Sequence, residues 1–73
     1  MLEFDGSKLK ELRKKRNLRQ RELAVLVGVK SSSHIANYEN GVATPPSDVL
    51  LNLMDILKVS EKGLSRPAEG AKV

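Results

Sequence analysis

The sequence contains no cysteine and a single histidine, and this scarcity limits the chemistry that it can perform. Without cysteine there is neither a disulfide framework nor a thiolate metal site. One histidine without a partner builds neither an imidazole metal site nor a catalytic dyad. We therefore expect no metal, no cofactor and no catalytic residue, and the class of protein that remains is a binding module.

Long apolar runs are also missing. No run approaches the ~18 residues that a membrane-spanning helix needs. The first residues include two acids and lack the apolar stretch of a secretory signal. These absences predict a cytoplasmic protein that has no membrane partner. The 73 residues, 40% of them hydrophobic, suffice for one small domain with a core.

Basic residues are concentrated in one part of the chain. The net charge is +4, and eight of the 13 Lys and Arg residues lie between Lys8 and Arg21, where Glu11 is the single acid. These eight are Lys8, Lys10, Arg13, Lys14, Lys15, Arg16, Arg19 and Arg21. A concentrated positive field suits a polyanion such as nucleic acid. It equally suits a solvated helix face, and charge alone leaves both interpretations open.

The hydrophobic spacing predicts four short helices and a last short turn. Apolar residues recur three or four positions apart, as they do on one face of a helix. The expected inward residues are Leu9 and Leu12 in the first helix, Leu23, Leu26 and Val27 in the second, Ile35 and Tyr38 in the third, Leu50, Leu53, Met54 and Leu57 in the fourth, and Leu64 in the last turn. No segment shows the alternation that is typical of a strand.

Small polar residues and glycines predict where these helices begin and end. The expected caps are Ser7, Ser31–Ser33 and Ser47, and the second helix is expected to begin near Arg19 or Gln20. The expected stops are Asn17, Gly28 and Asn40-Gly41, and the fourth helix is expected to run to about Lys58. The predicted fold is an all-α, compact bundle of four to five short helices. Residues 1–64 form the domain, and residues 65–73, which lack a hydrophobic period, are expected to be a flexible tail or linker.

The fourth expected helix, residues 48–58, carries more apolar residues than one buried face needs. Val49, Leu51 and Ile56 remain after the four inward residues are assigned. A small bundle can bury nearly all of its apolar residues, and then nothing is left over. Alternatively, the excess marks a face for self-association, because apolar surface beyond the core often forms an interface. A homodimer through this helix is therefore one of two open interpretations.

Three stretches in the middle of the chain form a pattern. They are Leu18–Ala24, Val27–Val29 and Ile35–Gly41. The pattern resembles the helix-turn-helix DNA-binding domains of phage repressors, Cro and the XRE-type regulators, over residues 7–60. Ala24 must be small where two helices cross closely, and Gly28 accepts positive φ in the turn.

The resemblance implies roles for individual residues. In this family the second helix of the motif enters the DNA major groove by its N-terminal end, which implies base contacts from Ser32, Ser33 and Asn37. The candidate contacts to phosphate are Gln20, Arg19, Arg21, Lys30 and Asn40. Arg13 and Glu39 match a pair that forms a structural salt bridge in many relatives. His34 is expected to be an exposed helix residue.

The chain departs from the family pattern at three points. From Gly28 to Ile35 it has one residue more than the usual spacing, and Lys30 is the candidate for the additional residue. This insertion either shifts the third helix or only lengthens the loop. The tip of the third helix carries no Arg, Lys or Gln, and the loop over residues 42–46 carries no basic residue. We expect weaker or less specific binding than that of a strong repressor.

These features favour a DNA-binding transcriptional regulator, a repressor that reads the major groove with residues 32–40. It is expected to act as a dimer on double-stranded DNA with a near-palindromic site. The alternative is a protein-interaction module on the same fold, similar to antitoxins or coactivators, with weak or no DNA binding. The apolar fourth helix and the non-basic third helix favour this alternative. No nucleophile–base pair or phosphate-binding glycine loop supports an enzyme.

Overall fold

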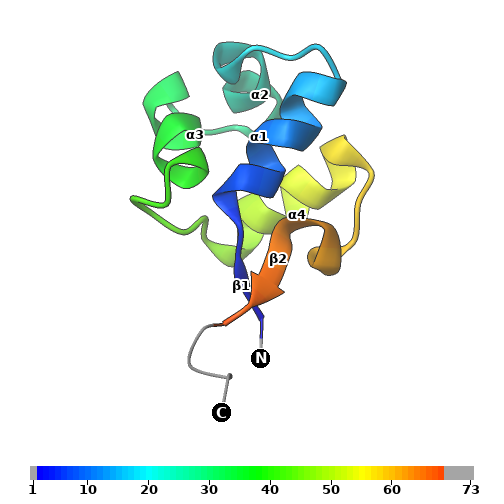
Figure 1. The fold of residues 1–73 in the computed structure, drawn as a ribbon. Helices are drawn as coiled ribbons and strands as arrows, with labels where there is room; N and C mark the ends of the chain where they lie inside the picture. Colours follow the sequence, from blue (N-terminus) through cyan, green and yellow to red (C-terminus); the bar gives the residue numbers. More distant parts are fainter. Residues whose placement is uncertain (1, 69–73) are drawn as a thin grey trace.

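In the computed structural model, which describes residues 2–68, helices α1 to α4 surround a common core and two short strands lie together at one end (Figure 1). In chain order the elements are β1 (Leu2–Phe4), α1 (Gly6–Lys15), α2 (Gln20–Val27), α3 (Ser32–Glu39), α4 (Ser47–Leu57), the 3₁₀ helix η1 (Glu61–Leu64) and β2 (Ser65–Pro67). The expected bundle of short helices is confirmed, and α2 and α3 are the two helices of the motif.

Three of the four helix stops follow the sequence signals, and the stop at Lys58 was not predicted. Left-handed backbone follows all four α-helices, at Asn17 (φ 57°), Gly28 (φ 80°), Gly41 (φ 75°) and Lys58 (φ 58°). At α2, Val29 N–H donates to Ala24 C=O (3.1 Å) and Gly28 N–H donates to Val25 C=O (3.2 Å). These two bonds form a Schellman motif, which satisfies carbonyl groups that have no partner within the helix.

Two predicted caps are wrong. Asp5, and not Ser7, caps α1, because its carboxylate accepts hydrogen bonds from the backbone N–H groups of Ser7 (2.9 Å) and Lys8 (3.3 Å). Helix α4 begins at Ser47, so Pro46 occupies the cap position. Proline suits the start of a helix, where a missing N–H removes no helical hydrogen bond.

The absence of strands was also predicted wrongly. Strand β2 pairs antiparallel with β1 and sets Leu2 opposite Pro67, Glu3 opposite Arg66 and Phe4 opposite Ser65. Ser65 is buried, and residues 65–67 therefore belong to the folded domain and not to a tail. Strands of three residues are too short for alternation to stand out in a sequence. Residues 69–73 lie outside the described part of the chain.

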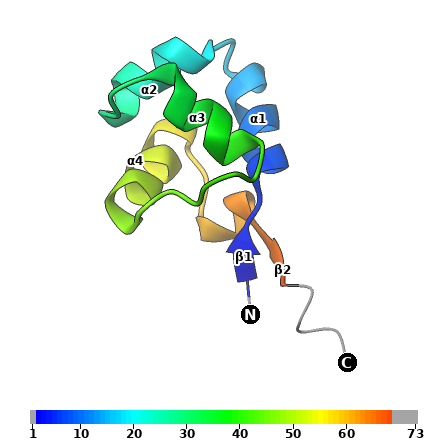
Figure 2. The same ribbon diagram turned by 90° about the vertical axis from the view of Figure 1, so that its left-hand side faces the viewer.

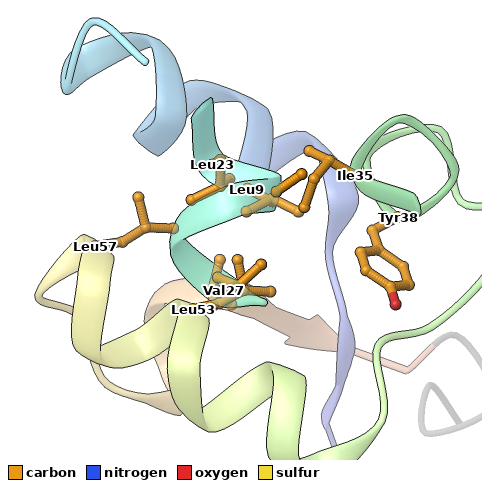
Figure 3. Packing of buried hydrophobic residues seen from close by; sticks show 9 residues of the cluster. Leu9, Leu23, Val27, Ile35, Tyr38, Leu53 and Leu57 are labelled. Atoms are coloured by element: carbon orange, nitrogen blue, oxygen red, sulfur yellow. The ribbon is translucent and has the colours of Figure 1, made fainter. Parts of the chain in front are cut away.

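The core draws on every helix of the bundle (Figure 3). Its buried residues are Leu9 from α1, Leu23, Ala24 and Val27 from α2, Ile35 and Tyr38 from α3, Leu53 and Leu57 from α4, and Leu64 from η1. The prediction of Leu26 as an inward residue is wrong, since it is 54% exposed and Ala24 takes the inward position instead. Short helices that each bury one face must share a single core.

Most of the apolar side chains of α4 pack against the core of the molecule. Val49, Leu50, Met54 and Ile56 are partly buried and pack against the core. Leu51, at 61% exposed, is the one strongly exposed large apolar residue of this helix. The expectation that Val49 and Ile56 are left over is therefore wrong, and most of the basis for a dimer through α4 is removed. Within residues 2–68, no helix is both long and apolar enough to cross a membrane.

Candidate nucleic-acid interface

Helix α3 presents a polar face to solvent. Ser33, His34 and Asn37 are exposed on it, and Asn40 is exposed at its C-terminal cap. Ser32, also a candidate for base contact, is half-buried. Figure 2 looks onto α3, which lies at the front of the molecule in that view. Ser33 and Asn37 are four positions apart, so their side chains lie on the same face of the helix.

An ion pair holds the side of α3 that is opposite its exposed face. Arg13 Nε lies 2.6 Å from Glu39 Oε2, and Arg13 Nη2 donates to Glu39 Oε1 at 3.2 Å. The two side chains are 10% and 1% exposed. This is the pair implied by the family resemblance. Arg13 Nη1 also donates to the carbonyl of Leu18 (2.8 Å), so its guanidinium connects α1, α3 and the segment that precedes α2. Bidentate geometry of this kind orients as well as stabilises.

Gln20 braces the same carboxylate from α2. Its Nε2 donates to Glu39 Oε1 at 3.0 Å. The Glu39 carboxylate thus accepts hydrogen bonds from two helices. A phosphate contact by Gln20 would use the second N–H of the same amide, because an amide nitrogen has two donors. The network holds α2 and α3 in one relative orientation.

The eight basic residues between Lys8 and Arg21 divide into two groups. Three have structural bonds: Arg13 as above, Lys8 Nζ to the carbonyl of Ser65 (2.5 Å), and Arg16 Nη2 to the carbonyl of Leu57 (3.1 Å). The second group consists of five exposed residues, and Arg16 of the first group is exposed as well. These five are Lys10, Lys14, Lys15, Arg19 and Arg21. Intramolecular bonding is a third role for the cluster, and the five exposed residues of the second group fit either interpretation of it. Arg16 thus satisfies a carbonyl in the last turn of α4.

The candidate phosphate contacts lie at the ends of the motif helices. Arg19 precedes α2, and Lys30 lies in the turn between α2 and α3. Both are exposed, and so are Arg21 and Asn40. The turn runs from Gly28 to Ser31, while Ile35 remains 0% exposed. The additional residue therefore does not prevent Ile35 from packing in the core between the helices.

Sequence reasoning missed a glycine that decides where α1 meets α3. A Cβ on Gly6 would lie within 2.6 Å of Glu39 C=O and would also strike Tyr38 C=O. Only glycine permits this approach of the N-terminus of α1 to the C-terminus of α3. The available signal was a glycine at the beginning of a helix, where glycine is common for other reasons.

A helix-turn-helix family model matches residues 9–64. The chain belongs to the XRE-type helix-turn-helix family. The match includes α1 to α4 and the 3₁₀ helix, apart from the first residues of α1. The family is one of DNA-binding domains and not of enzymes. A search of curated proteins found no match.

Solved structures of regulatory proteins resemble this helix-turn-helix domain. The P22 c2 repressor in complex with a synthetic operator has a TM-score of 0.74 and 33% identity, covering 80% of this chain and 86% of that chain. The restriction-modification controller C.AhdI from Aeromonas hydrophila has a TM-score of 0.71 and 29% identity, with coverage of 80% and 86%. SinR, the master regulator for biofilm formation, in complex with DNA, has a TM-score of 0.66 and 32% identity, with coverage of 75% and 87%.

This helix-turn-helix domain is a DNA-binding domain similar to repressors and regulators. Among residues 2–68 there is no group of three or more His, Asp or Glu side chains that could hold a metal ion. The described part of the site therefore consists of polar side chains on α3 and basic side chains around it. Such a surface can form hydrogen bonds and neutralise charge.

Proposed function

We propose that this domain is a sequence-specific transcriptional repressor that reads the DNA major groove with α3 and acts as a dimer on a near-palindromic site. The observation that carries the proposal is the exposed face of α3, whose opposite side is held by the Arg13–Glu39 pair. A rigidly held helix positions its side chains against base edges with little loss of conformational entropy. Two copies would use successive major grooves ~34 Å apart. The protein then acts in the cytoplasm, beside the DNA.

The base contacts of this proposal are Ser32, Ser33 and Asn37. The Asn37 side-chain amide can donate to and accept from adenine through a bidentate pair. Serine hydroxyls both donate and accept, so they discriminate less among bases. Asn37 is therefore the residue on which most of the sequence preference depends.

The phosphate contacts of this proposal surround α3. Lys30 lies before its N-terminus, Asn40 at its C-terminus, and Arg19, Gln20 and Arg21 at the start of α2. Contacts at both ends of a recognition helix fix its depth and register in the groove. Most of the affinity is then electrostatic and falls steeply with salt.

Fluorescence anisotropy with a random DNA duplex tests the proposal first. We expect binding at low salt and a large loss at near-physiological salt. Arg19→Gln should reduce the slope of log K against log salt by about 0.9, the value for one phosphate. Lys62→Gln, in η1 near the strands, removes one charge away from the proposed interface and should leave the slope unchanged. If the folded protein shows no binding at low salt, the DNA-binding role is wrong.

Sequence preference requires a second experiment. A duplex selected from a random pool should lose about 1–3 kcal/mol of binding free energy with Asn37→Ala, whereas binding to random duplex should change little. The matched control is Asn52→Ala on α4, an exposed asparagine whose amide donates to the carbonyl of Val27 at the end of α2. Equal losses on selected and random DNA would show that Asn37 does not read bases.

The second candidate function is a protein-interaction module on the same fold. One observation favours it: the exposed face of α3 carries Ser33, His34 and Asn37 but no Arg, Lys or Gln. Arginine to guanine is the commonest specific base contact, and this face cannot make it. A protein that is folded, ignores DNA at low salt and binds a protein partner through α3 would fit this second function.

A further inference from the structure

One imidazole ring is exposed near the N-terminus of α3. It belongs to His34, the third residue of this helix and the only histidine of the chain. His34 and Asn37 are three positions apart, so they are neighbours on the surface of the helix. The ring therefore lies beside the amide to which the proposed function assigns an adenine.

Ser31 bonds to this ring and does not cap the helix with its side chain. Serine is among the preferred cap residues, but the Ser31 side chain makes no cap hydrogen bond to the backbone of α3. Its Oγ lies 3.3 Å from His34 Nδ1 instead. Because both residues are exposed, this bond adds little stability. Its effect is to orient the ring at the N-terminal end of the helix.

The position of Nδ1 favours one tautomer of His34. A neutral imidazole has a proton on one ring nitrogen and a lone pair on the other. Nδ1 faces the cap residue, and the N-terminal end of a helix is the positive end of its dipole. A lone pair on Nδ1 is stabilised there, whereas an N–H group is not. The Ser31 hydroxyl then donates to Nδ1, and the proton lies on Nε2, the ring nitrogen away from Ser31.

We propose that His34, oriented by Ser31, reads a guanine in the major groove by donating from Nε2 to the edge that carries N7 and O6. This inference rests on the proposed function and adds a specificity-determining residue to its site. Guanine presents two adjacent acceptors in the major groove. Adenine has one acceptor beside an amino group, thymine has one beside a methyl group, and cytosine has an amino donor. A single N–H donor therefore fits guanine best.

The place of the ring favours a base edge over a phosphate. Side chains on a helix tilt toward its N-terminus, and the bond to Ser31 keeps the His34 ring at that end. A recognition helix of this type contacts base edges with its N-terminal residues. The candidate phosphate contacts Lys30 and Asn40 lie before and after the helix. The imidazole thus enters the groove with the tip of α3, between the two phosphate contacts.

The guanine contact gives the expected half-site a defined pattern. Side chains three positions apart have Cβ atoms about 5–6 Å apart, and successive base pairs are about 3.4 Å apart along the duplex. The guanine read by His34 then lies one or two base pairs from the adenine read by Asn37. Histidine offers one donor where arginine offers a bidentate pair, so the preference for guanine is weaker than an arginine would give.

A duplex selected by the wild-type chain from a random pool tests the contact. We expect a guanine within about two base pairs of the adenine that Asn37 reads. Inversion of this G·C pair to C·G should weaken wild-type binding about 2- to 12-fold, the range of one hydrogen bond. His34→Ala should bind the unchanged duplex more weakly by a similar factor and should not respond to the inversion. Asn52→Ala, the control on α4, should respond as the wild type does.

Two results of this experiment would overturn the inference. One is a response of His34→Ala to the inversion that equals the response of the wild type. The other is a fall of about 0.9 in the slope of log K against log salt for His34→Ala, which would indicate a phosphate contact. Binding of the wild type to random duplex is measured first. Absence of all DNA binding, which defeats the proposed function, is thereby distinguished from absence of a guanine preference.

The orientation by Ser31 has a readout that needs no DNA. Because the chain has a single histidine, proton–nitrogen NMR correlation of the isotope-labelled protein shows directly which ring nitrogen carries the proton. At mildly alkaline pH we expect the proton on Nε2 in the wild type and a mixture of tautomers in Ser31→Ala. Ser31→Ala should also lower the response to the inverted base pair. A wild type with the proton on Nδ1 would overturn the inference, because Nε2 would then be an acceptor.

Discussion

At the scale of single residues, one buried carboxylate organises the motif. Glu39 is 1% exposed at its side chain and accepts hydrogen bonds from Arg13 and Gln20. A buried ion pair contributes little net stability when it is complete, but removal of one partner leaves an uncompensated charge. The pair therefore sets the orientation of α3, and its loss affects the position of the recognition face.

Substitution of Arg13 tests this asymmetry. We expect Arg13→Met to lower the free energy of unfolding by about 3 kcal/mol, because Glu39 is left buried without its ionic partner. The double variant Arg13→Met/Glu39→Leu should recover much of this loss. Urea unfolding gives both values. A single variant within about 0.5 kcal/mol of wild type would indicate that the pair is solvated.

A second residue-scale prediction concerns Lys58, which ends α4 with φ of 58°. This conformation is unfavourable for residues that carry a Cβ and is readily adopted by glycine. We expect Lys58→Gly to raise the free energy of unfolding by about 1 kcal/mol. Lys58→Ala, which keeps the Cβ and removes the charge, serves as the control in the same thermal unfolding experiment. A gain by alanine equal to that of glycine would point to charge as the cause.

At the scale of elements, the two short strands fasten the end of the bundle away from α2. Asp5 N–H donates to the carbonyl of Leu64 (2.8 Å), and Arg66 Nε donates to Glu3 Oε1 (2.9 Å). Lys8 of α1 reaches the carbonyl of Ser65. Strands this short are marginal in isolation and depend on the helices beside them. The two strands hold η1, and with it Leu64, against the core.

Truncation separates the contribution of β2 from that of the residues that follow it. A chain that ends at Leu64 loses β2, and we expect its free energy of unfolding to fall by about 1–3 kcal/mol, because each net hydrogen bond contributes about 0.5–1.5 kcal/mol. A chain that ends at Ala68 keeps β2 and should match the full chain. Urea unfolding of the two truncated forms decides the matter, and equal stability would mean that the strand pair adds nothing.

At the scale of the whole molecule, the proposed function makes DNA binding depend on the arrangement of charge and on the number of copies. If about four phosphates are contacted per copy, the slope of log K against log salt is about −7 for a dimer and about −3.6 for one copy. We expect the steeper slope on a selected palindromic duplex and the shallower one on a duplex with a single half-site. Anisotropy titrations at several salt concentrations measure both. A slope near zero on either duplex would rule out the electrostatic part of the proposal.

Much of this molecule could be predicted from local patterns. The helix stops at Asn17, Gly28 and Gly41 follow from backbone preference, which acts within a few residues. The inward residues Leu9, Leu23 and Ile35 follow from helical periodicity. The pair of Arg13 and Glu39 was implied by family resemblance and not by spacing, because a contact between distant positions leaves no local pattern.

The sequence by itself determined the helices, their order and the helix-turn-helix motif, because hydrophobic period, turn residues and motif positions act along the chain. Only the tertiary structure decided which side chains are buried and which residues bond to distant parts of the chain. It paired β1 with β2, used Arg16 to close α4, packed Val49 and Ile56 inside, and left Leu26 outside. Such outcomes depend on how distant elements cross one another. The exposure of a side chain and its bonding partners are therefore properties of the packed molecule. They determine which surface of each helix remains available to DNA or to a second copy.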